Sequence, residues 1–366
     1  MYHHQIKNIA TQHETYIQDT PDFLRIIDKI NRGPTLDPNT LLVSMDASSL
    51  YTNIIHEEGL NSLHEALEKR DNPKVPTKFL LDLMEIILRE NIFEFHNQLW
   101  RQEIGAAMGS PPVLHYANVF MAQIDQIIKI LGSKYNDAEK EALRLLKRFF
   151  DDYFLLFVGT TRLLHKFLEE INRINSTIQL TINHASNENE AMEDRCDCES
   201  KSAIPFLDTL VSVKEGHIKV DLYKKETDCN QYLLPSSCHN KSVTTSIPFS
   251  LGLRIVRTCT DPIDRDTRLN ELKDFLLARE YNEKSIDSAI SRARGIPRQK
   301  ALKKVKRLKI KMVLYLQLHM ILGSLQLGLY MRNTGGLWHI KIGTWQKYSR
   351  SLPSLHSKDK RTSDNI

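Results

Sequence analysis

Two adjacent aspartates, Asp151 and Asp152, lie between two apolar runs and are the side chains in this sequence best suited to chemistry. The flanking runs within 147–158 are short, aromatic-rich and β-branched at the far end, which is typical of β-strands. The pair would then lie at the tip of a hairpin, where both carboxylates project from one rigid edge. About one such pair is expected by chance in a chain of this length, so a plain polar turn is the alternative.

A third carboxylate, Asp46, ends a buried-strand run that begins at Leu41. If that strand lies beside the hairpin, three carboxylates crowd one edge of a sheet. Two unit charges about 4 Å apart repel by about 4 kcal/mol at an effective dielectric of about 20. Such a cluster therefore needs cations, and hard oxygen ligands select Mg²⁺ or Mn²⁺. Two such ions can activate an attacking oxygen and stabilise the leaving one in phosphoryl transfer. For Asp46 alone, a helix or turn cap is the commoner role.

Two further features favour a nucleotide site over isolated caps. Tyr51 follows Asp46 closely, so a short turn would fold its ring back over the carboxylates. Gly109, Ser110 and Pro111 belong to a loop of small residues that opens a helix, and small residues let a flat base and sugar approach the backbone. A plain helix start with proline in its first turn is the alternative for this loop.

The elements that must position these residues follow from the hydrophobic pattern. Strands are predicted where the acids lie, and helices where apolar residues recur at helical spacing. The order favours an α+β domain with helices on one side of an antiparallel sheet, followed by a helical module. The predicted helices are 12–32, 56–70, 77–90, 113–131, 161–175, 246–259, 267–280 and 284–294, and the predicted strands are 41–46, the hairpin 92–95 with 98–103, the two that flank Asp151-Asp152, 178–182, and the hairpin 204–208 with 218–223.

Several motifs resemble, in order and in spacing, those of Penelope-like element reverse transcriptases over about residues 14–295. Leu42–Ile54 is similar to the first catalytic motif of that family, and Phe149–Asp152 stands where the family has an aromatic residue followed by x-Asp-Asp. Each motif is weak alone, but together they are highly specific. The other similar stretches are Ala107–Pro111, Ala117–Met121, Ile204–Asp208, Leu222–Thr227, Gln231–Leu233 and Ser237–His239.

The resemblance implies an RNA-directed DNA polymerase of a retrotransposon that uses two Mg²⁺ or Mn²⁺ ions. Its partners would be an RNA template, a DNA primer and deoxynucleoside triphosphates. The implied fold is a polymerase palm-type antiparallel sheet with helices on one face, followed by a thumb-like module that resembles a helix-turn-helix. The catalytic, metal-binding triad would be Asp46, Asp151 and Asp152.

The resemblance also implies roles around that triad. Ala47 would lend its backbone carbonyl to a metal. Tyr51 would stack under the sugar and reject a 2′-hydroxyl, and Gly109 with Ser110 would line the nucleotide and template. Two departures from the family pattern stand out: Phe149 replaces the usual tyrosine, and a second Ser-Pro does not follow the first.

The domains expected on this interpretation are four. The basic fingers region would be missing from the N-terminus, and no Gly-Ile-Tyr…Tyr-Ile-Gly endonuclease pattern appears at the C-terminus, so we expect a truncated element copy. A shifted reading frame in the last domain, relative to its ancestor, is a further hypothesis. The predicted divisions are a helical lead-in at 1–40, a palm at 41–230, a helical thumb-like module at 231–295 and a basic, partly disordered tail at 296–366.

Charge supports a polyanionic partner without requiring one. The net charge is +5 and the isoelectric point is near 8.8, and the basic residues concentrate after position 291. A solvated helix face is the alternative for such a run. A phosphate-contacting strip would make binding salt-dependent. The expected nucleic-acid contacts are Arg292, Arg294, Arg298, Lys303, Lys304 and Arg307.

The remaining features exclude little. The apolar run 312–331 is broken by polar residues, so we expect a buried or disordered segment and no membrane association. The five cysteines suggest ordinary thiols, since Cys196 and Cys198 lack the spacing of a zinc site. The chain start has no signal-peptide pattern, so we expect the nucleus or, alternatively, the cytoplasm. Two other functions stay open: a catalytically inactive nucleic-acid-binding remnant, and a host-recruited interaction protein.

Overall fold

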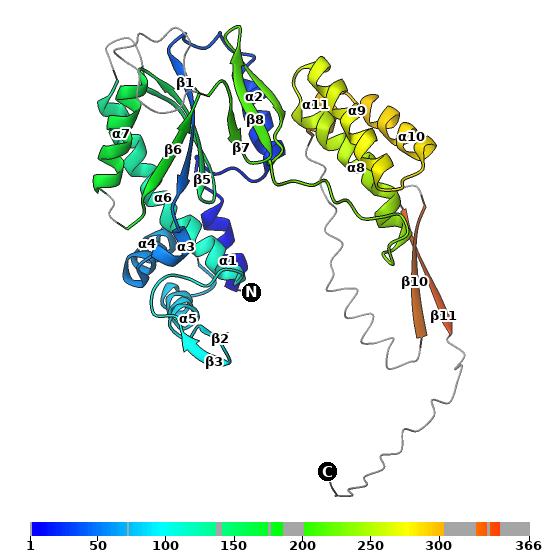
Figure 1. Cartoon of the computed structure of the whole chain (residues 1–366). Helices are drawn as coiled ribbons and strands as arrows, with labels where there is room; N and C mark the ends of the chain where they lie inside the picture. Colours follow the sequence, from blue (N-terminus) through cyan, green and yellow to red (C-terminus); the bar gives the residue numbers. More distant parts are fainter. Residues whose placement is uncertain are drawn as a thin grey trace, which may run out of the picture. The chain divides into compact units, whose positions relative to one another are not determined.

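The computed structural model describes residues 2–71, 73–136, 141–174, 177–185, 201–303, 327–334 and 337–344 (Figure 1). The chain divides into two compact units, residues 1–303 and 304–366. The predicted acids, Tyr51 and the small-residue loop all lie in the first unit. The described part of the second is one antiparallel strand pair, β10 (Leu327–Thr334) with β11 (Leu337–Thr344).

The centre of the first unit is a four-stranded sheet in the order β4-β5-β1-β6, and each neighbouring pair is antiparallel. Both acid-bearing segments predicted as strands are therefore strands of one sheet. They lie next to each other, because β1 pairs directly with β5. The bounds are β1 Thr40–Ala47, β4 Leu143–Phe149, β5 Asp152–Val158 and β6 Leu180–His184.

Helices cover one face of this sheet, as predicted. Val43 and Met45 of β1 and Leu155 of β5 point into this face's core, where they join apolar residues from the helices. Side chains alternate between the two faces of a strand, so the odd-numbered residues of β1 belong to this core. The helices that contribute are α1 (Tyr2–Ala10), α4 (His56–Glu68), α5 (Thr77–Arg89), α6 (Pro111–Lys134) and α7 (Thr161–Ile174).

The opposite face is also covered, over the part of the sheet away from the acids. Leu42, Phe154 and Leu156 pack there with residues of α2 (Thr20–Ile30) and of a second, three-stranded sheet. The sequence predicted two strands in that region, whereas a tight turn at Leu207, with a φ of 55°, adds a third. Its strands are β7 Ile204–Phe206, β8 Thr209–Lys214 and β9 His217–Leu222. Figure 1 shows α2 beside β7 and β8 of that sheet.

The first predicted helix, 12–32, is wrong in its N-terminal half. The observed α2 begins at Thr20, because the Asp19 side chain accepts a hydrogen bond from the Asp22 backbone N–H and Pro21 lies in the first turn. Both features specify a helix start. Residues 13–17 instead run in a non-helical path beside β4, and this path matters for the site below.

The helical module predicted near the C-terminus is present and has a core of its own. Ile255, Leu269 and Ile286 are among its buried residues. Asparagine and aspartate side chains cap the three long helices by accepting hydrogen bonds from first-turn backbone N–H groups. The helices are α8 Lys241–Thr258, α9 Pro262–Ala278, α10 Glu283–Arg294 and the short α11 Arg298–Ala301. The predicted boundary at 230/231 stays a prediction.

An exposed hairpin precedes the small-residue loop. It consists of β2 (Ile92–Phe95) and β3 (Gln98–Arg101), and its two-residue turn is formed by His96 and Asn97 with φ values of 52° and 58°. This matches the predicted hairpin and turn. Positive φ at both positions is the geometry of a tight hairpin turn.

Some predicted features lie outside the described residues. These are the segment 304–326, the last residues after 344, and the cysteines Cys196 and Cys198. Among the described helices, none has the length and apolar character needed to cross a membrane.

Candidate active site

The antiparallel register of β1 and β5 places two of the three predicted acids directly opposite each other. Asp46 at the end of β1 is the direct pairing partner of Asp152 at the start of β5. Both share the sheet face of Leu42 and Phe154, since each lies an even number of residues from those positions. Side chains of directly opposed residues in an antiparallel pair are about 5 Å apart at Cβ. Two carboxylates therefore converge at one end of the sheet.

The third acid lies in the turn that joins β4 to β5. Phe149 pairs with Asp152, so Phe150 and Asp151 form a two-residue turn. Phe150 adopts a φ of 56°, which is unfavourable for a bulky residue. The backbone N–H of Ala47 donates to the Asp151 carbonyl at 3.3 Å, so the end of β1 is bonded to the turn. Strained backbone of this kind persists only where the surroundings hold it in place.

The electrostatics of the cluster follow from this crowding. Burial, then the charges of Asp151 and Asp46, raise the pKa of Asp152 to about 6. Burial and the charge of Asp151 also raise the pKa of Asp46. The charge of Asp151 therefore disfavours ionisation of both Asp46 and Asp152. A cation would relieve this repulsion.

The donor set fits a hard divalent cation. Opposed carboxylates with raised pKa values offer the oxygen ligands that Mg²⁺ and Mn²⁺ prefer. The three acids do not, however, form a complete metal site in this structure. Within the described ranges, no three His, Cys, Asp or Glu side chains form a group that could hold a metal ion. The metal-binding role of the triad stays a prediction.

Tyr51 lies within electrostatic reach of Asp151, and its predicted contact with a nucleotide sugar stays a prediction. It belongs to the short helix α3 (Leu50–Asn53), and it is half-buried. Burial and then the charge of Asp151 raise the pKa of its hydroxyl. The Tyr51 carbonyl accepts a hydrogen bond from the Ala106 N–H at 2.6 Å, which fastens the small-residue loop to the same helix.

The small-residue loop contains two glycines with different surroundings. One has no room for a side chain, and the other borders open space. Gly105 has a φ of +78°, and a Cβ there would lie 2.6 Å from the Tyr51 carbonyl oxygen and 2.7 Å from that of Thr52. Gly109 has a φ of +95°, but a Cβ there would meet nothing within 4 Å. Ser110 directly precedes α6 and makes no capping hydrogen bond with its side chain. The exposed end of the loop is thus free for a ligand.

Replacing Gly105 with alanine is expected to destabilise the protein by about 2 to 4 kcal/mol, because backbone strain and a backbone clash add together. Gly109→Ala is the matched control, since it brings the same positive φ without the clash and should cost about 1 kcal/mol. Urea denaturation of both variants measures the difference. Equal losses in the two variants would contradict the assigned packing of Gly105 against Tyr51.

A basic residue that the sequence analysis did not assign to the site is Lys225. Its charge lowers the pKa of Asp152, opposing the effect of the neighbouring acids, so it lies within electrostatic reach of the cluster. Lys225 is exposed and follows β9 in the chain. The sequence held a signal for this lysine in the motif Leu222–Thr227. Two lysines follow each other there, shortly after a strand that carries none of the three acids.

The residues predicted to contact nucleic acid are largely engaged within the protein. Arg292 lies over the ring of Phe249 at 3.8 Å, and Arg294 forms an ion pair with Asp266 at 3.2 Å. Arg298 has a side chain only 19% exposed, pairs with Asp28 and donates to the Arg257 carbonyl. Lys303 is exposed, whereas Lys304 and Arg307 lie outside the described residues. Their contact with nucleic acid stays a prediction.

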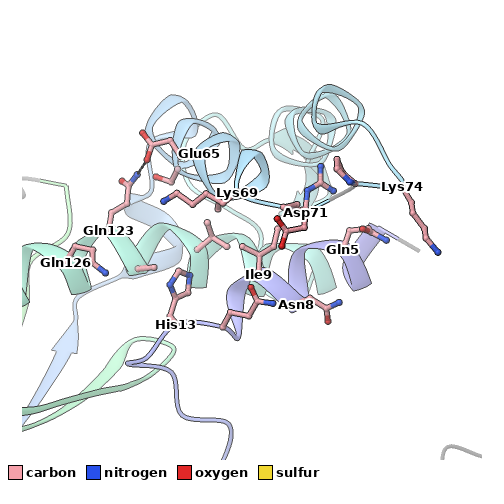
Figure 2. Close-up of a pocket in the computed structure, with 17 residues that line it drawn as sticks. Gln5, Asn8, Ile9, His13, Glu65, Lys69, Asp71, Lys74, Gln123 and Gln126 are labelled. Carbon is pink, nitrogen blue, oxygen red and sulfur yellow. Dashed lines mark hydrogen bonds between the residues drawn. The ribbon is translucent and has the colours of Figure 1, made fainter.

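A polar cavity of about 820 Å³ lies apart from the acids, between α1, α4 and α6 (Figure 2). Figure 2 shows amide side chains such as Gln5 and Gln126 together with Lys69, and a hydrogen bond joins Gln123 to Glu65 at 3.4 Å. None of the predicted site residues lines it. Burial is the main cause of the lowered pKa of His13, another lining residue.

Comparison with known proteins supports the fold. Residues 231–291 match the family model described as the animal helix-turn-helix domain, which is less than half of the chain. The structure of telomerase from Candida albicans, in complex with a fragment of telomeric RNA, matches with a TM-score of 0.55 at 10% identity over 79% of this chain and 48% of that chain. At this identity the match shows the fold alone: a polymerase palm-type α+β fold followed by helices, as predicted.

Two weaker matches accompany it. Apo telomerase from Candida tropicalis gives a TM-score of 0.49 at 11% identity over 80% of this chain and 49% of that chain. The RNA-dependent RNA polymerase of a sicinivirus gives 0.42 at 12% identity over 75% and 54%. The chain spans about half the length of the telomerase chains it matches. No curated protein matches the sequence.

Proposed function

We propose that this chain is an RNA-directed DNA polymerase from a retrotransposon of the Penelope-like class, acting by two-metal nucleotidyl transfer in the nucleus. The observation that carries the proposal is the register of β1 and β5, which opposes Asp46 to Asp152 beside the turn residue Asp151. This arrangement occurs on a fold similar to that of a telomerase. On this proposal residues 41–230 are the palm and residues 231–295 the thumb-like module.

The chain's own groups account for most of the proposed chemistry. Asp46, Asp151 and Asp152 supply the carboxylate oxygens that would hold two Mg²⁺ or Mn²⁺ ions, and these ions would stabilise charge on the reacting oxygens. Tyr51 lies close enough to Asp151 for the charge of that carboxylate to raise the pKa of the tyrosine hydroxyl. Its ring would then contact the sugar of a nucleotide held by the acids. The open loop end at Gly109 gives the base and template room.

Primer extension on an RNA template with Mg²⁺ tests this function. The wild-type chain is expected to extend a DNA primer with deoxynucleoside triphosphates, and Asp151→Asn is expected to abolish extension because it removes a metal-binding charge. Asp82→Asn is the matched control, since Asp82 is an exposed acid on α5 that forms an ion pair with Lys78. Equal extension by wild type and Asp151→Asn would exclude the proposed site.

The helix-turn-helix match over 231–291 favours one alternative, a nucleic-acid-binding protein without polymerase activity. In that case the wild-type chain would extend nothing and would still bind nucleic acid, with affinity that falls as salt rises. Absence of both extension and binding would instead favour a protein-interaction role for the retained fold.

A further inference from the structure

Arg148 is a fully buried arginine directly behind the acidic cluster. It lies two residues before Phe150, pairs with Tyr153 across the hairpin and has a side chain that is 0% exposed. Its strand position is on the helix-covered face, because Tyr153 packs in that core. The carboxylates of Asp46 and Asp152 lie on the other face of the same two strands.

All five N–H donors of the Arg148 guanidinium have acceptors. Asp125 on α6 accepts two, from Nε at 2.8 Å and from the second terminal nitrogen at 2.9 Å. Asn118, two turns earlier on the same face of α6, accepts two more, through its side-chain oxygen and, at 3.3 Å, its carbonyl. The fifth reaches the carbonyl of Phe150 in the turn at 2.9 Å. A fixed fork of five donors is a property of arginine alone.

Asp125 is in turn fully engaged. Besides Arg148 it accepts hydrogen bonds from the hydroxyls of Tyr153, at 2.8 Å, and Thr15. Arg148 also bonds through its backbone to the segment around Thr15, donating to the Thr15 carbonyl at 2.7 Å. One buried network therefore joins the chain before α2, the middle of α6 and the β4–β5 hairpin.

We propose that Arg148, held by Asp125 and Asn118, is the positioning residue that fixes the Phe150–Asp151 turn and so sets the three carboxylates in their metal-binding geometry. The proposal rests on the proposed function of those acids. Phe150 has a φ of 56°, which a bulky residue does not adopt without support, and its carbonyl is the group that Arg148 holds. Another bond to the turn, from the Ala47 N–H to the Asp151 carbonyl, is longer at 3.3 Å.

A merely structural ion pair would make a different prediction. Replacing a buried ion pair by apolar residues of similar volume is often neutral for stability, because the desolvation cost disappears with the charges. Such a replacement cannot restore a hydrogen bond to the Phe150 carbonyl. Stability and turn geometry can therefore be separated by experiment.

The test uses the full chain in two variants. Arg148→Met combined with Asp125→Leu removes both charges and keeps apolar packing, and Arg148→Lys keeps the charge without the fork, in case the double variant does not fold. Hydrogen–deuterium exchange reports on the turn, and electron paramagnetic resonance of free Mn²⁺ reports on metal affinity. Arg268→Met with Asp221→Leu is the matched control. Two guanidinium nitrogens of Arg268 also contact the Asp221 carboxylate, the shortest N–O distance is 2.7 Å, and the pair is far from the turn in sequence.

In both Arg148 variants the turn amides are expected to exchange roughly tenfold faster. Mn²⁺ affinity is expected to fall roughly 10- to 100-fold, which is the usual loss when a group that orients a metal ligand is removed. The control should change neither quantity. Wild-type exchange and Mn²⁺ affinity in a folded Arg148 variant would overturn the proposal. A wild-type chain that binds Mn²⁺ through Arg148-dependent acids but extends no primer would instead exclude the polymerase function and leave the positioning role intact.

Discussion

Replacing Asp152 with asparagine is expected to reduce primer extension by roughly a thousandfold or more, equivalent to about 4 kcal/mol of transition-state stabilisation. The amide keeps the shape of the side chain but loses the charge that would attract a divalent cation. Because Asp152 is the direct partner of Asp46, the loss removes one of only two opposed carboxylates at this end of the sheet. Single-turnover extension assays at saturating primer–template and Mg²⁺ measure the effect.

The same variant is expected to be more stable than the wild type at high pH. The pKa of Asp152 is raised from 3.8 to about 6 in the folded chain, so folding favours the protonated acid and stability is lost as pH rises through that interval. Asparagine carries no charge and escapes this loss. Discounted for partial exposure, the gain above pH 6 is about 1 kcal/mol, and it vanishes near pH 4.

Thermal melts of metal-free protein at pH 4.5 and pH 8, compared between wild type and Asp152→Asn, check this expectation. Asp82→Asn, at an exposed position of α5, serves as the control and should not gain stability at pH 8. A variant that is less stable than the wild type at pH 8 would mean that the acids do not repel one another. Loss of extension with a gain in stability is the signature expected of a functional carboxylate cluster.

Replacing Asp125 with leucine alone is expected to destabilise the protein by about 3 to 5 kcal/mol, because it leaves the Arg148 charge buried without a partner. The hydroxyls of Tyr153 and Thr15 lose their acceptor at the same time. Urea denaturation followed by circular dichroism gives the change in unfolding free energy.

Two controls bracket this expectation. Adding Arg148→Met to Asp125→Leu should recover a large part of the loss, because the unpaired charge is removed. Asp221→Leu, which breaks a partly exposed pair with Arg268, should cost less. A loss below about 1 kcal/mol for Asp125→Leu would show that the network contributes no more than an exposed ion pair.

The sequence allowed much of the fold around the acids to be predicted. The apolar runs beside Asp46 and Asp151-Asp152 are locally specified strands, and most of the helices have clear apolar periodicity. The register that opposes Asp46 to Asp152 could not be derived, because strand pairing depends on the core packed beneath both strands. The third strand after Leu207 was missed because the strand that follows is separated from β7 by only a two-residue turn.

The buried network was also missed, for a similar reason. An arginine near the end of a strand is ordinarily solvated, and nothing in the local sequence marks Arg148 as buried. A signal existed in α6, where Asn118 and Asp125 interrupt an apolar helix two turns apart and so share one face. Polar residues on the buried face of a helix require partners, and this requirement predicts a buried donor without identifying which one.

The span of this network has a consequence for how the chain reaches its native state. The hydrogen bond from Thr15 to Asp125 joins residues 110 positions apart, and the Thr15 carbonyl also accepts from the Arg148 N–H, so the N-terminal segment gains these partners only when α6 and β4 are in place. Long-range contacts of this kind form late, since the loop must close before they contribute. The acidic turn, which depends on Arg148, is therefore expected to settle among the last steps of folding. During synthesis, a ribosome-bound intermediate that has β1 and α4 would still lack the completed acidic turn.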